Sequence, residues 1–205
     1  MTNDSVLDEY AAHAADIAPM FEALSTADVL EPVAKFLPVA PADIADVGAG
    51  TGRDAAWFAE LGHRVVAVEP VAGLAAYGKT HHSKTIEWCD DTLPELTTLT
   101  ATARAFDLIL VGSVWHHLDE QTSLAALHSL GMRLKPHGNL IISLKEFANE
   151  GQAAATITAS DLRQQFSQAN LSLTFETRSD GHQSHNRLAG NTWVWFVVTK
   201  AQAKP

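Results

Sequence analysis

Short apolar runs alternate with longer segments of helical spacing through most of the chain. Runs rich in Val and Ile predict strands, and they cover residues 43–47, 64–68, 86–88, 106–111 and 139–144. Between them, apolar residues recur three and four positions apart, which predicts helices over 54–61, 71–77 and 120–134. Strands that alternate with helices are typical of a parallel sheet with helices on both faces.

The two ends of the chain follow other patterns. The first forty residues predict two helices, the first capped by Ser5 and the second by Thr26. Near the C-terminus, a helix over 160–169, capped by Ser160, precedes two strand-like runs at 171–177 and 192–199. The polar segment that joins these runs contains no helical crossover, so we expect the two strands to pair antiparallel.

The first predicted strand leads directly into the alternating glycines Gly48, Gly50 and Gly52, and a helix follows. Glycines at such a turn let the backbone approach a ligand that a Cβ atom would repel. The helix that follows directs its free N–H groups toward the same place. The stretch therefore predicts a cofactor crevice at the carboxyl edge of the sheet.

Two carboxylates indicate which ligand this crevice suits. Glu69 ends the second strand, where an acidic residue can accept the hydroxyl hydrogens of a ribose. Asp46 lies just inside the end of the first strand, where a carboxylate repels pyrophosphate but attracts an amino group or a sulfonium, directly or through water. A dinucleotide fingerprint also has a longer spacing between its second and third glycines. A cationic, phosphate-free nucleoside is thus favoured, and an NAD-dependent oxidoreductase is the less favoured alternative.

With these motifs the chain resembles the class I S-adenosylmethionine-dependent methyltransferases over nearly its whole length. The run 46–52 is similar to the first motif of that family, and Glu69 stands where its ribose-binding acid does. Residues 88–94 resemble the segment with the adenine-binding Asp, 106–118 the fourth strand and its loop, and 134–140 the turn before the fifth strand. The resemblance implies a Rossmann-like three-layer αβα sandwich. Its mostly parallel seven-stranded sheet would have an antiparallel last strand and the order 3-2-1-4-5-7-6.

The resemblance also implies a set of cofactor-binding residues. Asp90 is expected to bind adenine, with Asp91 as the alternative if the register shifts by one, and Tyr10 is expected to close over the methionine end. The full expected set is Tyr10, Asp46, Gly48, Ala49, Gly50, Thr51, Gly52, Arg53, Glu69, Asp90, Asp91, Ser113, Val114 and His117.

The acceptor is less defined by the sequence. A general base is needed only if the acceptor must lose a proton, and the candidates are His116, Glu146 and His182. His182 and His185 have a spacing that could hold a metal, but no Cys or carboxylate completes the set, so no metal is expected. Trp115 could face the acceptor. The predicted acceptor site lies between the N-terminal helices, the loop after Val114 and the segment 147–158.

Composition narrows the function classes. The 205-residue chain is 46% hydrophobic and 19% charged, which indicates one globular domain at 41–205 with residues 1–40 as its helical cap. Its net charge of −10 disfavours nucleic acid as a partner. The single Cys89 and the lack of an apolar leader or membrane-length run predict a cytoplasmic protein. We expect it to be a monomer or a homodimer. We therefore expect methyl transfer to a small molecule, with a non-catalytic S-adenosylmethionine-binding protein as the alternative.

Overall fold

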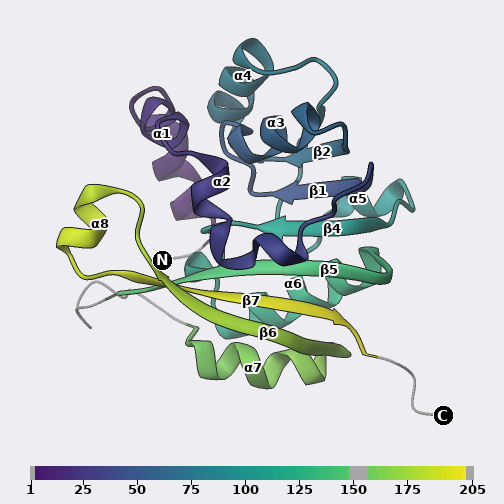
Figure 1. Cartoon of the computed structure of the whole chain (residues 1–205). Helices are drawn as coiled ribbons and strands as arrows, with labels where there is room; N and C mark the ends of the chain where they lie inside the picture. The colour runs from purple at the N-terminus through teal and green to yellow at the C-terminus, as the bar shows by residue number, and fades with distance from the viewer. Residues whose placement is uncertain (1–2, 148–156, 202–205) are drawn as a thin grey trace.

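The computed structural model describes residues 3–147 and 157–201 and shows three layers, with one sheet between two layers of helices (Figure 1). The sheet has the order β3-β2-β1-β4-β5-β7-β6, as expected. Its strands are β1 (Asp43–Val47), β2 (Arg64–Val68), β3 (Glu87–Cys89), β4 (Phe106–Val111), β5 (Leu134–Glu146), β6 (Leu171–Asp180) and β7 (Thr192–Lys200). Strands β1 to β5 pair in parallel, and β7 pairs antiparallel with both β5 and β6.

The helices divide between the two faces of this sheet. The helical elements are α1 (Asn3–Glu22), α2 (Thr26–Val29), η1 (Glu31–Phe36), α3 (Arg53–Glu60), α4 (Ala72–His81), α5 (Thr97–Ala101), η2 (Trp115–His117), α6 (Glu120–Arg133), α7 (Ala159–Gln168) and α8 (Ser184–Leu188). One apolar core lies under α5, α6 and α7, and a second lies under η1 and α3 on the other face. Among the described residues, no helix is long and apolar enough to cross a bilayer.

Strand β5 is longer than the sequence pattern predicts. The expected turn before it is part of the strand, which starts at Leu134 opposite Phe106. Asn139 then pairs with Leu108, so the residues between Leu134 and Asn139 bulge out of the ladder. His137 adopts a φ of 67° within this bulge. The polar and Pro-containing stretch thus interrupts the pairing and does not end the strand.

Three predicted helix starts are wrong by a few residues. Helix α1 already begins at Asn3, so Ser5 lies inside its first turn. The side chain that caps α2 is that of Ser25, whose Oγ accepts the Asp28 N–H at 3.3 Å. Thr158, and not Ser160, caps α7 through a capping box. Neighbouring hydroxyl residues are similar caps, so the pattern alone does not choose between them.

The second predicted helix divides into the short α2 and the 3-10 helix η1. Pro32 stands at the start of η1, where its missing N–H prevents an α-helical bond to the preceding turn. The sequence pattern also did not predict α5, η2 or α8, which are only three to five residues long. Elements this short have too few residues to show a period.

Candidate functional site

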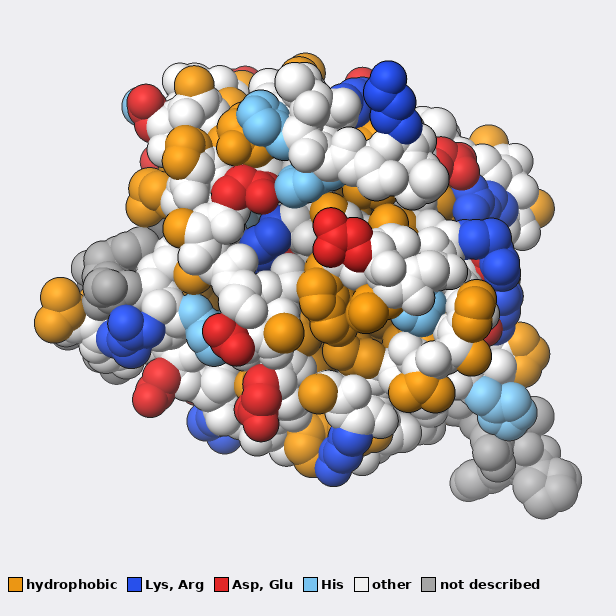
Figure 2. All heavy atoms as spheres, turned by 45° about the horizontal axis from the view of Figure 1, so that its top comes forward, with side chains coloured by type: hydrophobic (Ala, Val, Ile, Leu, Met, Phe, Trp, Pro, Cys, Tyr) orange, Lys and Arg blue, Asp and Glu red, His pale blue; other side chains and the backbone are white. Residues whose placement is uncertain are grey.

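A cavity of about 430 Å³ opens at the carboxyl edge of the sheet, between the β1–α3 loop, the ends of β2, β4 and β5, and helix α1. In Figure 2, hydrophobic side chains gather toward the middle of the face shown, beside acidic ones, and most basic side chains lie toward its margins. The predicted site residues in the cavity wall are Tyr10, Asp46, Gly48, Ala49, Gly50, Thr51, Arg53, Glu69, Asp91, Ser113, Val114, His116, His117 and His182. Gly52, Asp90 and Glu146 are not in the wall.

The glycine loop has the backbone conformation that glycine requires. Gly48, Gly50 and Gly52 have φ values of 72°, 58° and 77°, all in the left-handed region. A Cβ atom on Gly48 would lie 2.3 Å from Cγ2 of Val114, so a side chain there cannot be accommodated without movement. A Cβ atom on Gly50 would lie 3.5 Å from the Phe21 ring, beside the cavity. The loop thus keeps its backbone bare where it faces the cavity.

Glu69 is held in place by the backbone around it. Its Oε2 accepts the N–H of Gly50 at 2.7 Å, and its Oε1 accepts the N–H of Val71 at 2.7 Å. Burial raises the pKa of Glu69 to about 7, although these two hydrogen bonds act in the opposite direction. Each oxygen keeps lone-pair capacity for a further donor. The carboxylate is therefore oriented and suited to accept two hydroxyl hydrogens of a ribose.

Asp46 is a buried carboxylate with an unused oxygen. Asp46 is only 3% exposed, and its Oδ2 has no hydrogen-bond partner. Burial raises the pKa of Asp46 well above its usual range, and the nearby Asp54 adds to this effect. A ligand that brings an amino group or a sulfonium to the cavity would relieve this cost. The donor set thus fits a cationic adenosine derivative.

The two candidate adenine ligands differ in their positions. Asp91 lies in the cavity wall, and its Oδ2 and Oδ1 accept the N–H groups of Leu99 at 2.8 Å and Thr92 at 3.0 Å. Asp90 is exposed and stands outside the wall. The carboxylate of Asp91 therefore links the segment after β3 to the first turn of α5, next to the cavity.

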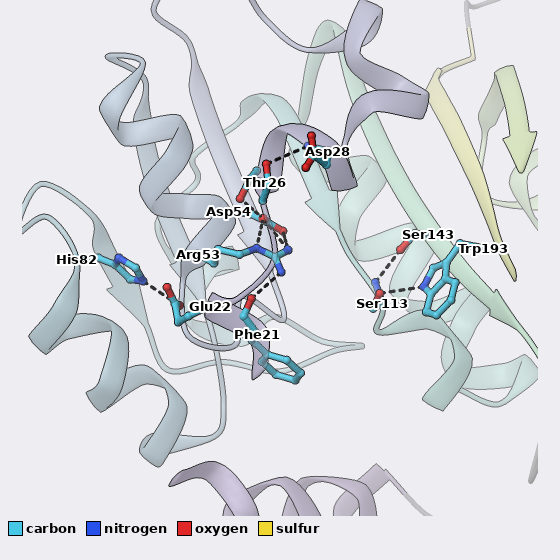
Figure 3. A network of polar contacts seen from close by, with 11 residues as sticks. Phe21, Glu22, Thr26, Asp28, Arg53, Asp54, His82, Ser113, Ser143 and Trp193 are labelled. Atoms are coloured by element: carbon cyan, nitrogen blue, oxygen red, sulfur yellow. Dashed lines mark hydrogen bonds and ion pairs between the residues drawn. The ribbon is translucent and has the colours of Figure 1, made fainter. Parts of the chain in front are cut away.

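A polar network attaches the end of α1 to the start of α3 (Figure 3). Arg53 donates to the carbonyl of Phe21 at 3.1 Å and pairs with Asp54 at 2.8 Å. Asp54 also accepts the hydroxyl hydrogen of Thr26 at 2.7 Å. On the far side, Glu22 contacts His82 at 3.1 Å. This network keeps the N-terminal helices over the glycine loop.

Two adjacent histidines lie at the other end of the cavity. The Tyr10 hydroxyl is 3.3 Å from Nε2 of His117, and the rings of His116 and His117 are 4.1 Å apart. Burial lowers the pKa of both histidines, most strongly that of His116, and the charge of Lys145 lowers both further. Nδ1 of His116 is shielded and has no hydrogen-bond partner. Both imidazoles are therefore neutral at pH 7, and His116 has one uncommitted nitrogen.

Ser113 connects three strands beside these histidines. It follows β4 and has a φ of 57°, which is strained for a residue with a side chain. Its N–H donates to Ser143 on β5 at 2.8 Å, and its Oγ accepts Nε1–H of Trp193 on β7 at 3.1 Å (Figure 3). The structure therefore fixes the β4 loop against the far half of the sheet.

Several residues proposed for the acceptor side lie elsewhere. Glu146 pairs with Arg178 at 3.2 Å and is outside the cavity wall. The prediction that Trp115 faces the acceptor is wrong, because its side chain is fully buried and its Nε1 donates to Ser123. His182 lies exposed in the wall, whereas the side chain of His185 is outside the described part. Of the predicted acceptor segment, residues 148–156 lie outside the described residues.

Two tryptophans of the wall were missed as site residues. Trp193 and Trp195 were assigned to a buried last strand, yet both line the cavity. They alternate with Val194 and Phe196, which belong to the core on the opposite face. This alternation was a signal in the sequence, but it becomes informative only when the pairing of β7 with β5 is known.

Comparison with known proteins connects this geometry to a family. Residues 44–138 match the family described as "Methyltransferase domain". No curated protein matches the chain in sequence. Among solved structures, the 1,6-didemethyltoxoflavin-N1-methyltransferase of Burkholderia thailandensis, with 1,6-didemethyltoxoflavin and S-adenosylhomocysteine bound, is similar at a TM-score of 0.69 and 21% identity. The match covers 96% of this chain and 88% of that one.

Two further solved structures share the fold. A TehB-like SAM-dependent methyltransferase from Corynebacterium glutamicum has a TM-score of 0.68 and 20% identity, over 97% of this chain and all 100% of the other. A ribosomal protein methylase from Lactobacillus delbrueckii subsp. bulgaricus has a TM-score of 0.56 and 17% identity, over 86% of this chain and 77% of the other. The sheet order, the glycine loop and the matched domain all agree with a methyltransferase fold. Residues 44–138 thus match a methyltransferase domain, and the chain has the fold of the S-adenosylmethionine-dependent methyltransferases among these structures.

Proposed function

We propose that this protein transfers the methyl group of S-adenosylmethionine to a small organic acceptor and leaves S-adenosylhomocysteine. The observation that carries the proposal is one continuous cavity that joins the glycine loop and Glu69 to His116, His117 and Trp193. One end provides groups for a cationic nucleoside, and the other provides rings and polar groups for a second molecule. Such a two-ended site suits a group transfer between two bound molecules.

Different residues of the chain would bind different parts of the methyl donor. Glu69 would hold the ribose hydroxyls, Asp46 would face the positively charged amino-acid part, and Asp91 would lie beside the adenine base. The bound donor supplies an electrophilic methyl group on a sulfonium. The protein must then align the acceptor behind that methyl group and exclude water. Tyr10 and Phe21 of α1, both in the cavity wall, serve the exclusion of water.

A proton acceptor is needed if the methyl acceptor attacks through a hydroxyl or protonated nitrogen. His116 is the strongest candidate, because it is neutral and lies in the cavity wall. His182 lies in the same wall but is exposed. Glu146 is less suitable because Arg178 already binds its carboxylate.

The size of the acceptor is part of the proposal. Helix α1 contributes Val6, Tyr10 and Ile17 to the cavity wall and so covers the site from one side. A covered cavity favours a small molecule over a folded protein substrate. Among the similar structures, one is a 1,6-didemethyltoxoflavin-N1-methyltransferase and another a ribosomal protein methylase, so the acceptor needs a direct test.

We also propose that the protein is cytoplasmic. Its half-buried Cys89 is a free thiol, which suits a reducing compartment.

The test has two steps. Calorimetry with S-adenosylmethionine should show binding by the wild type and clearly weaker binding by Glu69→Gln. Incubation with methyl-labelled S-adenosylmethionine and a low-molecular-weight extract should then produce S-adenosylhomocysteine and a labelled small product. Binding without turnover on either small-molecule or protein fractions would favour a non-catalytic binding protein. Labelled protein alone would contradict the small acceptor.

A further inference from the structure

We propose that the acceptor is a planar or aromatic acid, bound through its anionic group by Lys145 and through its ring by Trp193. This inference rests on the proposed function, because it specifies the molecule that occupies the second end of the same cavity. The geometry that carries it is a cross-strand row at the carboxyl edge of β5 and its two antiparallel neighbours.

The row consists of Lys145 on β5, Trp193 on β7 and Ser179 on β6. Lys145 pairs with Trp193, and Trp193 pairs with Ser179, so the three side chains project from one face of the sheet. Ser143 and Trp195 form the next row on the same face. All five residues line the cavity. The floor of this end is thus made of two indole rings, two hydroxyls and one ammonium group.

The ammonium group of Lys145 lies among rings and has no ion-pair partner within the described part of the chain. Its Nζ is 4.6 Å from the centroid of the Phe147 ring and 5.5 Å from that of Trp193. Burial lowers the pKa of Lys145, as expected for a cation removed from water without an anion to balance it. A carboxylate or phenolate on the bound acceptor would supply that anion, in a partly desolvated site where the attraction is strong.

No nearby charged group in the described part of the chain forms an ion pair with Lys145, so an anion on the acceptor can do so. Glu146 belongs to a row that strand alternation places on the opposite face, where it pairs with Arg178. Asp180, at the end of β6, is exposed and contributes to the cavity wall, but it forms no ion pair with Lys145. Glu9, whose charge acts on His117, is exposed and outside the cavity wall. The histidines are neutral, so they add no charge of their own. Asp46 and Glu69 lie at the other end, where the positive methyl donor faces them.

The indole of Trp193 is positioned to stack on a planar ligand. Its Nε1–H donates to Ser113, which fixes the ring orientation beside the β4 loop (Figure 3). Stacking on an aromatic ring, together with a charge-assisted hydrogen bond, recognises a flat acid and disfavours both an aliphatic acid and a flat amine.

The experiment uses the full-length protein saturated with S-adenosylhomocysteine. Calorimetry then measures the binding of three naphthalene probes that carry a carboxylate, a carboxamide or an aminomethyl group. We expect the carboxylate to bind at least tenfold more tightly than either of the others. Lys145→Gln should remove this preference while the carboxamide affinity stays within twofold, Lys145→Arg should keep it, and the exposed Lys84→Gln should match the wild type.

The first titration, with S-adenosylhomocysteine alone, separates the two proposals. If the protein and Lys145→Gln bind this compound equally, the cofactor site is intact and the variant is folded, so the probe results judge only the acceptor class. A carboxylate bound no more tightly than the carboxamide, including the case in which neither binds, overturns the inference. An unchanged preference in Lys145→Gln also overturns it. Failure to bind S-adenosylhomocysteine overturns the proposed function itself.

Discussion

The backbone N–H of Gly50 donates to Oε2 of Glu69 at 2.7 Å, so the glycine loop orients the carboxylate before any ligand arrives. This contact joins the turn after β1 to the end of β2. The two elements that the sequence indicates as the cofactor site are therefore one hydrogen-bonded unit. A preorganised carboxylate loses less entropy on binding than a free one.

Replacing Glu69 with Gln should weaken S-adenosylhomocysteine binding by about 10- to 100-fold, the value of one or two hydrogen bonds to a charged group. The amide has one acceptor oxygen in place of two, so it cannot hold both backbone N–H groups and both hydroxyls. Calorimetry measures the loss. Glu60→Gln, an exposed change at the end of α3, is the matched control and should bind normally. Equal affinities of the two variants for S-adenosylhomocysteine would mean that Glu69 does not bind the cofactor.

Cofactor affinity should depend on pH. The pKa of Glu69 is raised to about 7, so below that value the free protein holds a proton that it must release to accept two hydroxyl hydrogens. The apparent affinity for S-adenosylhomocysteine should therefore fall by up to about tenfold per pH unit as the pH decreases below 7, and level off above it. In Glu69→Gln the part of the slope due to Glu69 should vanish. A wild-type affinity that rises toward acid pH would show the opposite sign.

Two glycine substitutions separate backbone strain from the loss of the site. Gly50→Ala and Gly62→Ala both place a Cβ atom on a left-handed residue, with φ values of 58° and 88°. Both should lower the free energy of unfolding in urea by about 1 kcal/mol. Only Gly50→Ala should also abolish cofactor binding, because its Cβ atom lies beside the cavity, whereas Gly62 has no atom within 4 Å of that position. Parallel losses of affinity in both variants would mean that strain alone is responsible.

Ser123→Ala should destabilise the protein without affecting the site. Its fully buried hydroxyl accepts Nε1–H of Trp115 at 2.9 Å and donates to Gln165 at 2.7 Å, so the change leaves two polar groups unpaired. We expect a loss of about 1–3 kcal/mol in the free energy of unfolding, with unchanged affinity for S-adenosylhomocysteine. The exposed Ser167→Ala serves as the control for stability. A loss of acceptor turnover without a loss of stability would contradict this account and would mean that Trp115 contacts the acceptor.

The parallel half of the fold was predictable from the sequence because its strands are buried on both faces. The bounds of β1, β2 and β4 agree with their apolar runs, and the sheet order agrees with the one implied by the family resemblance. The cap of α2 was not predictable to the residue, since Ser25 and Thr26 both carry a hydroxyl. Local propensity decides that an element exists, and packing decides where it ends.

The cofactor end of the site was more predictable than the acceptor end. The glycine loop and Glu69 are local motifs, and the structure brings them together. Lys145 and Trp193 are far apart in sequence and meet only through the register of β5 with β7. The same register places Glu146 on the opposite face, which no local pattern shows. A change of one residue in strand register exchanges the two faces, so this end requires the structure.

The most direct measurement is a pair of calorimetric titrations of the wild-type protein, one with S-adenosylhomocysteine and one with NAD. A loop that places Asp46 and Glu69 around a phosphate-free adenosine derivative should bind S-adenosylhomocysteine at least about 100-fold more tightly, because the diphosphate of NAD brings negative charge to buried carboxylates. Tighter binding of NAD, or no binding of S-adenosylhomocysteine, would contradict the assignment of the cavity.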